Sequence, residues 1–304
     1  MIKSNVITQI YQKLVKDQDI RKFKKKFYYY ILFRLCRKFL NNYIEIKIYD
    51  FKILASNKNN KTSHGILKKC DFDDQNELKT IKKFSDKKKL FLIDCGCNYG
   101  FYSFYTASLS KNNFVISFEA SLKTSKDFNK NLKLNNFKNI ILKNFAISDI
   151  DSSEVMFNES INDWESSLTH NNFEKNRLTV LNTITIDTAL NNYLLDGQFL
   201  FIKLDIEGHE LKAIEGAKNT IKKYNPIFII ELSKYIFEND INSFIYLENF
   251  LINFDYKIYG TNNKLITIEE IKNSLKNLNF DQKTIGNYYL IKNDKNFINI
   301  FINE

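Results

Sequence analysis

The segment FLIDCGCNYG, residues 91–100, constrains the fold of this chain more than any other. Its apolar residues end at Asp94, and the turn that follows contains Gly96 and Gly100. Glycine lets a backbone take positive φ angles and come close to a ligand where a side chain would interfere. The segment therefore predicts a buried strand that opens into a ligand-binding turn before a helix.

A second apolar run, Phe114–Phe118, ends in a carboxylate, Glu119, roughly twenty residues after the glycine turn. A carboxylate at the tip of a strand can accept hydrogen bonds from both hydroxyls of a ribose. The glycine spacing differs from the G-x-G-x-x-G of nicotinamide and flavin enzymes, and no Lys-Ser or Lys-Thr follows to hold a triphosphate with Mg²⁺. The two segments predict a site for a nucleoside without a phosphate chain, of which S-adenosylmethionine is the common example.

A third segment, FIKLDIEGHE at residues 201–210, repeats the pattern of an apolar strand that ends in acids. Asp205 and Glu207 stand at its tip, and Gly208 follows them. In an open parallel sheet, ligands bind beyond the carboxyl ends of the central strands. We therefore expect the acids of this segment and those of the first two to face one crevice.

Further short motifs accompany the three segments along the chain, and together they resemble the FkbM family of S-adenosylmethionine-dependent methyltransferases. The resemblance runs from about Gly65 to about Ser233. It departs from the family at Cys97, where alanine is usual, and at Ala120, where proline is frequent, and neither change removes a polar group. The accompanying motifs are Asn131 with Asn135, Ala146–Ser148, Ser166–Leu168, Thr185–Asp187 and Ile230–Glu231.

The resemblance implies an α/β fold, the class I or Rossmann-like methyltransferase fold, with a seven-stranded, mostly parallel sheet and helices on both faces. Apolar runs predict strands near residues 90–94, 114–118, 139–145, 200–205 and 227–232, and periodicity predicts a helix near 74–84. The alternation of a doubly wound fold predicts helices near 101–109, 121–135, 187–195 and 209–224, and a further helix is expected near 241–253. Strands near 256–259 and 288–291 would complete the sheet. Residues 150–185 read as a long polar loop that acts as a lid or as a wall for the substrate.

A length of 304 residues suits one large domain with an appendage. We expect residues 1–62 to form a basic N-terminal extension, with a helical part up to residue 42 and a hairpin of strands Tyr43–Ile48 and Phe51–Ala55. Residues 63–304 would form the methyltransferase domain. The four cysteines follow no disulfide or zinc spacing, so Cys95 and Cys97 are expected to pack beneath the glycine turn.

The resemblance also assigns the residues that would bind the cofactor. The turn Gly96–Gly100 would hold the methionine end of S-adenosylmethionine, with Asp94 as the countercharge to its ammonium group. Glu119 would accept the ribose hydroxyls, and Asn144–Ala146 would border the adenine. The predicted cofactor-binding residues are Asp94, Gly96, Asn98, Gly100, Glu119, Asn144 and Ala146.

Asp205, Glu207 and His209 are the candidate catalytic residues, because they follow the strand beside the expected position of the methyl group. The two acids would orient the acceptor, act as a base, or bind Mg²⁺. A simpler interpretation makes Glu207 the cap of the helix that begins near Gly208, and His209 a residue of its first turn without a chemical role. The sequence leaves these alternatives open.

The net charge of +10 comes with many Lys, Asn and Ile residues, a composition that AT-rich coding produces, so a solvated lysine surface is the simplest explanation. The segment Arg21–Leu40 nevertheless has the composition of a helix that lies on an anionic membrane. In the alternative interpretation, the apolar side of this helix packs against the sheet and its lysines face water. No apolar run approaches the ~18 residues that span a bilayer, so we expect a cytoplasmic protein, peripheral at the inner face of the membrane if this segment binds lipid.

The chemical class of the acceptor is constrained mainly by the motifs that the chain lacks. Enzymes that methylate amino groups on DNA bases usually have an Asn or Asp followed by Pro-Pro and an aromatic residue, and those that methylate cytosine at carbon usually have a Pro-Cys nucleophile. The single proline, Pro226, stands between Asn225 and Ile227, so the chain has neither motif. The resemblance implies a hydroxyl acceptor on a sugar of a surface glycan or on a secondary metabolite. Two alternatives are an RNA-directed methyltransferase relative and a catalytically silent adapter that binds S-adenosylmethionine; the four strand-tip acids favour an active enzyme.

Overall fold

The computed structural model describes residues 43–56, 73–160, 168, 176–193, 195, 197–238, 242–279 and 284–302. The predicted helical region over residues 1–42, with its basic segment 21–40, lies outside these residues. So do Ser166, Ser167 and two of the four cysteines, Cys36 and Cys70.

The chain is built on an eight-stranded sheet in which the five strands of the central core run parallel. The remaining three strands pair antiparallel at one edge. The predicted α/β class and the mostly parallel sheet are confirmed, and the one strand beyond the predicted seven is the two-residue β12. The order across the sheet is β12 (Leu265–Ile266), β11 (Tyr256–Gly260), β13 (Thr284–Lys292), β10 (Ile227–Ser233), β9 (Phe199–Leu204), β3 (Leu90–Cys95), β4 (Phe114–Phe118) and β5 (Ile140–Lys143).

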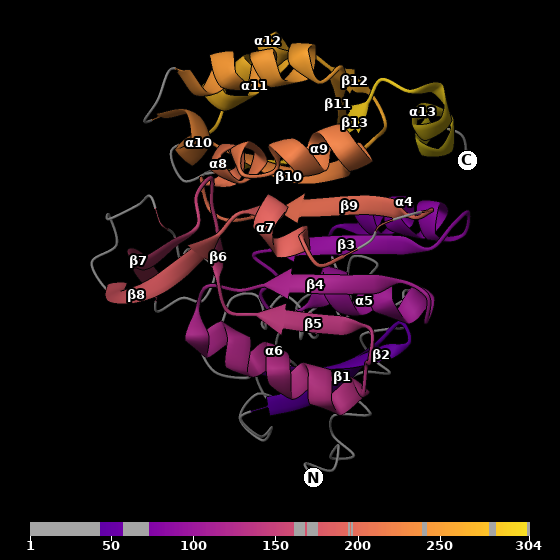
Figure 1. Cartoon of the computed structure of the whole chain (residues 1–304), viewed down its shortest axis with the longest axis vertical. Helices are drawn as coiled ribbons and strands as arrows, with labels where there is room; N and C mark the ends of the chain where they lie inside the picture. The colour runs from indigo at the N-terminus through magenta and orange to yellow at the C-terminus, as the bar shows by residue number, and fades with distance from the viewer. Residues whose placement is uncertain are drawn as a thin grey trace, which may run out of the picture.

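Two layers of helices cover the sheet, as Figure 1 shows. Each layer buries its own cluster of apolar side chains against one face of the sheet. On one face lie α4 (Gln75–Ser85), α5 (Phe101–Leu109), α6 (Leu122–Asn135) and α13 (Lys295–Ile302). On the other lie α7 (Ile186–Leu190), α8 (Glu210–Glu215), α9 (Lys218–Tyr224), α10 (Lys234–Glu238), α11 (Asn242–Asn253) and α12 (Ile268–Lys276).

The predicted N-terminal hairpin is confirmed as β1 (Tyr43–Ile48) and β2 (Phe51–Ser56), which pair antiparallel. Its buried apolar side chains, among them Ile46 and Ile53, join the same core as α5 and α6. The hairpin therefore packs on the domain that is built around the main sheet and extends its core.

The insertion at residues 150–185 differs from the predicted loop, because most of its described part is a two-stranded antiparallel ribbon. The ribbon consists of β7 (Ser152–Ser160) and β8 (Asn176–Ile184), and β8 also pairs with the short β6 (Ala146–Ile147). In Figure 1 it projects at the left, the side toward which the arrowheads of β4, β5 and β9 point. The alternation of exposed Met156 with buried Phe157 is the strand signal that the polar composition conceals.

Two predicted helices are shorter than expected. The helix predicted over 209–224 is two helices, broken at Gly216, where a Cβ atom would lie 2.2 Å from the backbone oxygen of Ser148. The helix predicted over 187–195 ends at Leu190. None of the helices among the described residues combines the length and the apolar character needed to cross a membrane.

Candidate functional site

A pocket opens beyond the carboxyl ends of the parallel strands, where the chain order changes direction between β3 and β9. Its empty volume is about 650 Å³, open solvent included. Of the predicted site residues, Asp94, Gly100 and Asn144 do not line it, and the other seven do. The lining residues are Gly96, Asn98, Phe118, Glu119, Ala120, Phe145, Ala146, Ile147, Phe157, Leu168, Asp205, Ile206, Glu207 and His209.

The glycine turn is held by close packing at both of its glycines. Gly96 has a φ of +76°, and a Cβ atom there would lie 1.9 Å from the backbone oxygen of Asp205. Gly100 has a φ of +89°, and a Cβ atom would lie 2.6 Å from the rings of Phe104 and Phe128. The two glycines thus bring the turn against the tip of β9 and against the helices behind it, which joins the two acidic strand tips into one site.

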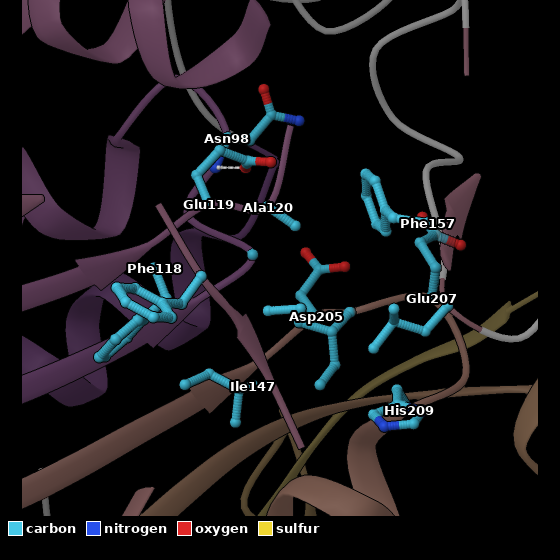
Figure 2. Close-up of a pocket in the computed structure, with 14 residues that line it drawn as sticks. Asn98, Phe118, Glu119, Ala120, Ile147, Phe157, Asp205, Glu207 and His209 are labelled. Atoms are coloured by element: carbon cyan, nitrogen blue, oxygen red, sulfur yellow. Dashed lines mark hydrogen bonds between the residues drawn. The ribbon is translucent and has the colours of Figure 1, made fainter. Parts of the chain in front are cut away.

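Glu119 presents both of its carboxylate oxygens at the pocket. Oε2 accepts a hydrogen bond from the backbone N–H of Asn98, and Oε1 accepts one from the backbone N–H of Ser121, each at 2.9 Å. Figure 2 shows the contact with Asn98 as a dashed line. Burial raises the pKa of Glu119 to about 7, although the two N–H groups oppose the shift. Each oxygen keeps a lone pair for a further donor.

Asp94 lies beneath the turn and is 1% exposed. Its Oδ2 accepts a hydrogen bond from the Ser103 hydroxyl at 2.5 Å, and Ser103 also contacts the hydroxyl of Ser117 at 2.7 Å. Burial raises the pKa of Asp94, while Lys203 and Ser103 lower it. Its other oxygen, Oδ1, is buried without a hydrogen-bond partner, so Asp94 retains acceptor capacity directly below the glycine turn.

Asn144 supports the site from outside its lining. Its amide donates hydrogen bonds to the backbone oxygens of Glu119 at 2.6 Å and Ala120 at 3.0 Å, and to the hydroxyl of Ser125 at 3.2 Å. These bonds fix the loop after β4. The neighbouring predicted residue, Ala146, lines the pocket between Phe145 and Ile147 and contributes to an apolar wall.

The end of the pocket that Asp205 and Glu207 line is acidic. The Nζ atom of Lys203 lies 2.7 Å from Oδ2 of Asp205, and the side chains are 4% and 38% exposed respectively. The ammonium group is therefore buried beneath the pocket, while the carboxylate of Asp205 reaches into it. Burial would lower the pKa of Lys203, but Asp205 and Asp94 raise it above the ordinary lysine value. Figure 2 shows Asp205 between Glu119 on one side and Glu207 on the other.

A third carboxyl group, that of Glu231, also belongs to this end, although its position in the sequence predicted no role for it. Carboxylate oxygens of Asp205, Glu207 and Glu231 lie within 4.8 Å of one another, a spacing at which they could hold a metal ion. The Lys203 ammonium already occupies a position beside Asp205 and supplies one positive charge there. The spacing fits Mg²⁺, but the charge of Lys203 competes with it.

His209 lines the pocket at the start of α8. Its Nε2 lies 2.9 Å from the hydroxyl of Ser148, and its Nδ1 is buried without a partner. Burial lowers the pKa of His209 to about 4, against the opposing charge of Asp149. The imidazole is therefore neutral at pH 7 and a weak base. Its contact with Ser148 and its low pKa together fit a role in holding that hydroxyl rather than in accepting a proton from a substrate.

Glu210 fixes the loop that carries these residues. Its carboxylate accepts hydrogen bonds from the backbone N–H groups of Ile206 at 2.9 Å and Gly208 at 3.0 Å. Burial raises the pKa of Glu210 to about 7. Glu207 is the acid for which a capping role was the simpler prediction, but the carboxylate that binds these N–H groups is that of Glu210. An acid in the first turn of a predicted helix is the signal that identifies it.

The insertion contributes Phe157 of β7, and Leu168, to the pocket wall. Phe157 faces inward, whereas Met156 beside it is 53% exposed. The insertion therefore lines the pocket, and its role as a lid or as a wall for the substrate stays a prediction.

The sequence model of the family described as Methyltransferase FkbM domain matches residues 94–258, more than half of the 304 residues. No curated protein matches the chain.

Solved structures match the chain at low identity. The crystal structure of Methyltransferase FkbM from Methylobacillus flagellatus KT is 16% identical, with a TM-score of 0.40, and the match covers 93% of this chain and 58% of that chain. This chain thus corresponds to little more than half of that protein. The structure of M. jannaschii TYW2 in complex with AdoMet is 11% identical, with a TM-score of 0.40 and coverage of 83% and 88%. Precorrin-6y C5,15-methyltransferase from Geobacter metallireducens GS-15 is 12% identical, with a TM-score of 0.36 and coverage of 70% and 83%.

Proposed function

This chain belongs to the FkbM family of methyltransferases, and on that premise we propose that it transfers a methyl group from S-adenosylmethionine to a hydroxyl group. The acceptor we propose is a sugar of a surface glycan or a secondary metabolite. The observation that carries the donor assignment is Glu119, whose two oxygens lie at the pocket with one lone pair each left for a ribose hydroxyl.

The other residues around the donor end fit the same ligand. The unpartnered Oδ1 of Asp94 is suited to the ammonium group of the methionine moiety, directly or through water. Phe118, Phe145 and Ile147 give an apolar surface suited to the flat face of adenine. When bound, S-adenosylmethionine supplies a methyl group that its positively charged sulfur has already activated.

The protein then has two tasks, which are to align the acceptor and to remove its proton. Asp205 is the residue we assign to the proton, because its carboxylate reaches into the pocket and Lys203 fixes one of its oxygens. Glu207, with a carboxylate oxygen within 4.8 Å of one of Asp205, would orient the acceptor. Because the ammonium of Lys203 already neutralises Asp205, we propose that the acids act without Mg²⁺.

The lining supports a hydroxyl acceptor over RNA. Among the described residues that line the pocket, none is Lys or Arg, although phosphate contacts are made chiefly by such residues. Carboxylates such as Asp205 and Glu207 accept hydrogen bonds from hydroxyl groups. Phe157 offers an apolar surface beside them.

The proposal is tested in two steps. Calorimetry with S-adenosylmethionine and S-adenosylhomocysteine should show binding to the wild-type protein, weakened at least about tenfold in Glu119→Ala because charge-assisted hydrogen bonds are lost. Glu248→Gln, a change at an exposed acid of α11, is the matched control and should bind as the wild type does. Equal affinity in Glu119→Ala would refute the ribose assignment.

Transfer from labelled donor is then measured on nucleotide sugars, glycan fragments and RNA. Label on a sugar hydroxyl supports the proposed acceptor, and label on RNA supports the nucleic-acid alternative. Donor binding without transfer to any member of the panel would favour the silent adapter.

A further inference from the structure

Glu207 has a backbone conformation that its residue type disfavours. Its φ is +55°, in the left-handed region, where a Cβ atom comes too close to the following carbonyl oxygen. Most of the non-glycine residues with positive φ in the described part of the chain are Asn or Asp, whose short polar side chains tolerate this region. Glutamate lacks that advantage, so the conformation of Glu207 persists only if its surroundings hold it.

The hydrogen bonds on either side of Glu207 come from Glu210. The carboxylate of Glu210 accepts from the backbone N–H of Ile206 at 2.9 Å and from that of Gly208 at 3.0 Å. Gly208 also has a positive φ, of +99°. The N–H groups of such a turn form a concave site for an anion, and here the anion is a side chain of the protein itself, 1% exposed.

These bonds differ from those of an ordinary helix cap. In a capping box, the acid stands at the third helical position and binds the N–H of the N-cap residue. Glu210 is instead the first residue of α8, after the N-cap His209, and its partners Ile206 and Gly208 both precede the helix. The carboxylate therefore fixes the shape of the loop before α8.

The turn that Glu210 fixes carries a side chain of the pocket. Glu207 and Asp205 both line the pocket (Figure 2), and carboxylate oxygens of the two residues lie within 4.8 Å of each other. We propose that Glu210 is a positioning residue, which holds Glu207 in the left-handed conformation so that its carboxylate stays beside Asp205 and orients the acceptor. The role toward the acceptor rests on the proposed function, whereas the held conformation does not.

The test compares alanine with glycine at position 207 of the full chain. Both changes remove the carboxylate, and only alanine keeps the Cβ atom that the left-handed conformation disfavours. Chemical denaturation should give Glu207→Ala an unfolding constant about three to ten times that of Glu207→Gly, because the strain outweighs the greater freedom of glycine in the unfolded chain. In a Glu210→Ala background the loop can relax, and this ratio should fall to about one or below.

Glu154 allows a matched control. It is also a glutamate with positive φ, +60°, but it is exposed, lies in the bulge of β7 and is not among the residues that line the pocket. The ratio of unfolding constants for alanine and glycine at position 154 should be the same with and without Glu210→Ala. A ratio at position 207 that also stays the same would overturn the proposal.

A milder change covers the case in which the Glu210→Ala variants do not fold. Glu210→Gln keeps one acceptor oxygen and loses the other, so the ratio at position 207 should fall at least about twofold in that background. An unchanged ratio there would overturn the proposal in the same way.

The role toward the acceptor is measured by transfer from labelled donor. Glu207→Ala and Glu210→Ala should each raise the KM for the acceptor at least about tenfold. The double variant should raise it no further, because both changes remove the same carboxylate from its place. Effects that multiply in the double variant would show that Glu210 does not act through Glu207.

Calorimetry with S-adenosylhomocysteine separates this proposal from the proposed function. Glu207→Ala and Glu210→Ala should keep the donor affinity of the wild type within a few-fold. A wild-type protein that does not bind the donor would refute the proposed function, and the unfolding constants, which need no ligand, would still decide whether Glu210 holds Glu207.

Discussion

The side-chain oxygen of Asn131, on α6, accepts a hydrogen bond from the backbone N–H of Leu54, on β2, at 2.7 Å. Asn135, one turn later, accepts from the N–H of Lys52 and donates to its carbonyl oxygen, each at 2.6 Å. The amide of Asn131 also donates to the backbone oxygen of Tyr99, in the glycine turn, at 3.4 Å. One fully buried asparagine thus ties the N-terminal hairpin to the turn that we assign to the methyl donor.

Replacing Asn131 with alanine should lower the free energy of unfolding by about 2–3 kcal/mol, because buried backbone groups lose their hydrogen-bond partner. Chemical denaturation of the full chain measures the loss. Asn135→Ala is the matched comparison, and a smaller loss is expected there because its bonds to Lys52 are exposed to water. Equal losses in the two variants would contradict the role assigned to Asn131.

The affinity for S-adenosylhomocysteine should fall as the pH falls below 7. Burial raises the pKa of Glu119 to about 7 in the free protein, and a bound ribose favours the ionised carboxylate, so binding lowers that pKa. Linkage then predicts a dissociation constant about tenfold larger at pH 6 than at pH 8. Calorimetry at several pH values measures it, and Glu119→Gln should show a weaker affinity without this dependence. A pH-independent affinity in wild type would show that Glu119 does not meet the ligand.

Asp205→Asn should reduce turnover by a factor of about 100 while donor affinity changes only a few-fold, because the change removes a proton acceptor and leaves the donor site intact. Turnover is measured on the panel member that the wild type modifies. EDTA should leave wild-type turnover unchanged, since Lys203 already neutralises Asp205. A loss of turnover with EDTA, restored by Mg²⁺, would instead establish the metal interpretation of the acidic cluster.

Gly96→Ala should destabilise the fold more than Gly197→Ala. Both glycines have positive φ angles, +76° and +70°, so alanine costs about 1–2 kcal/mol of backbone strain at either position. At Gly96 the new Cβ atom would also lie 1.9 Å from the oxygen of Asp205, whereas at Gly197 the nearest atom is 3.9 Å away. Thermal unfolding of the two variants compares them, and similar unfolding temperatures would argue against close packing between the turn and β9.

The strands and helices of the central sheet could be predicted because their signals are local. Apolar runs predicted β4 with its observed bounds and β3 to within one residue, and the alternation of strands with helices predicted α5 with its observed bounds. The ribbon β7–β8 was missed because pairing of Met156 with Val180 depends on residues far apart in the chain. The break at Gly216 depends on the distant backbone of Ser148, which no local pattern reveals.

The residues of the candidate site also divide into those with a local sequence signal and those that only the folded chain brings together. Glycines and strand-tip acids such as Glu119 and Asp205 are recognisable because each stands at the end of its own apolar run. Lys203 stands two residues before Asp205 on the same strand, but its position beside Asp94, and that of Glu231 beside Asn287, come from strand register and have no local signal. Only the assembled sheet shows that Lys203 and Glu231 flank the same carboxylate.

The wall that Phe157 contributes belongs to a sheet that shares no strand with the main one. Residues can therefore be inserted, deleted or exchanged in β7 and β8 without shifting the register of the strands that carry Glu119 and Asp205. β8 also pairs with β6, whose Ala146 and Ile147 line the pocket at the donor end that we propose, so changes in β8 reach both ends of the site. Exchange of β7 between homologues is therefore the more selective way to alter the wall at Phe157, and with it the acceptor preference that the proposed function assigns to this wall.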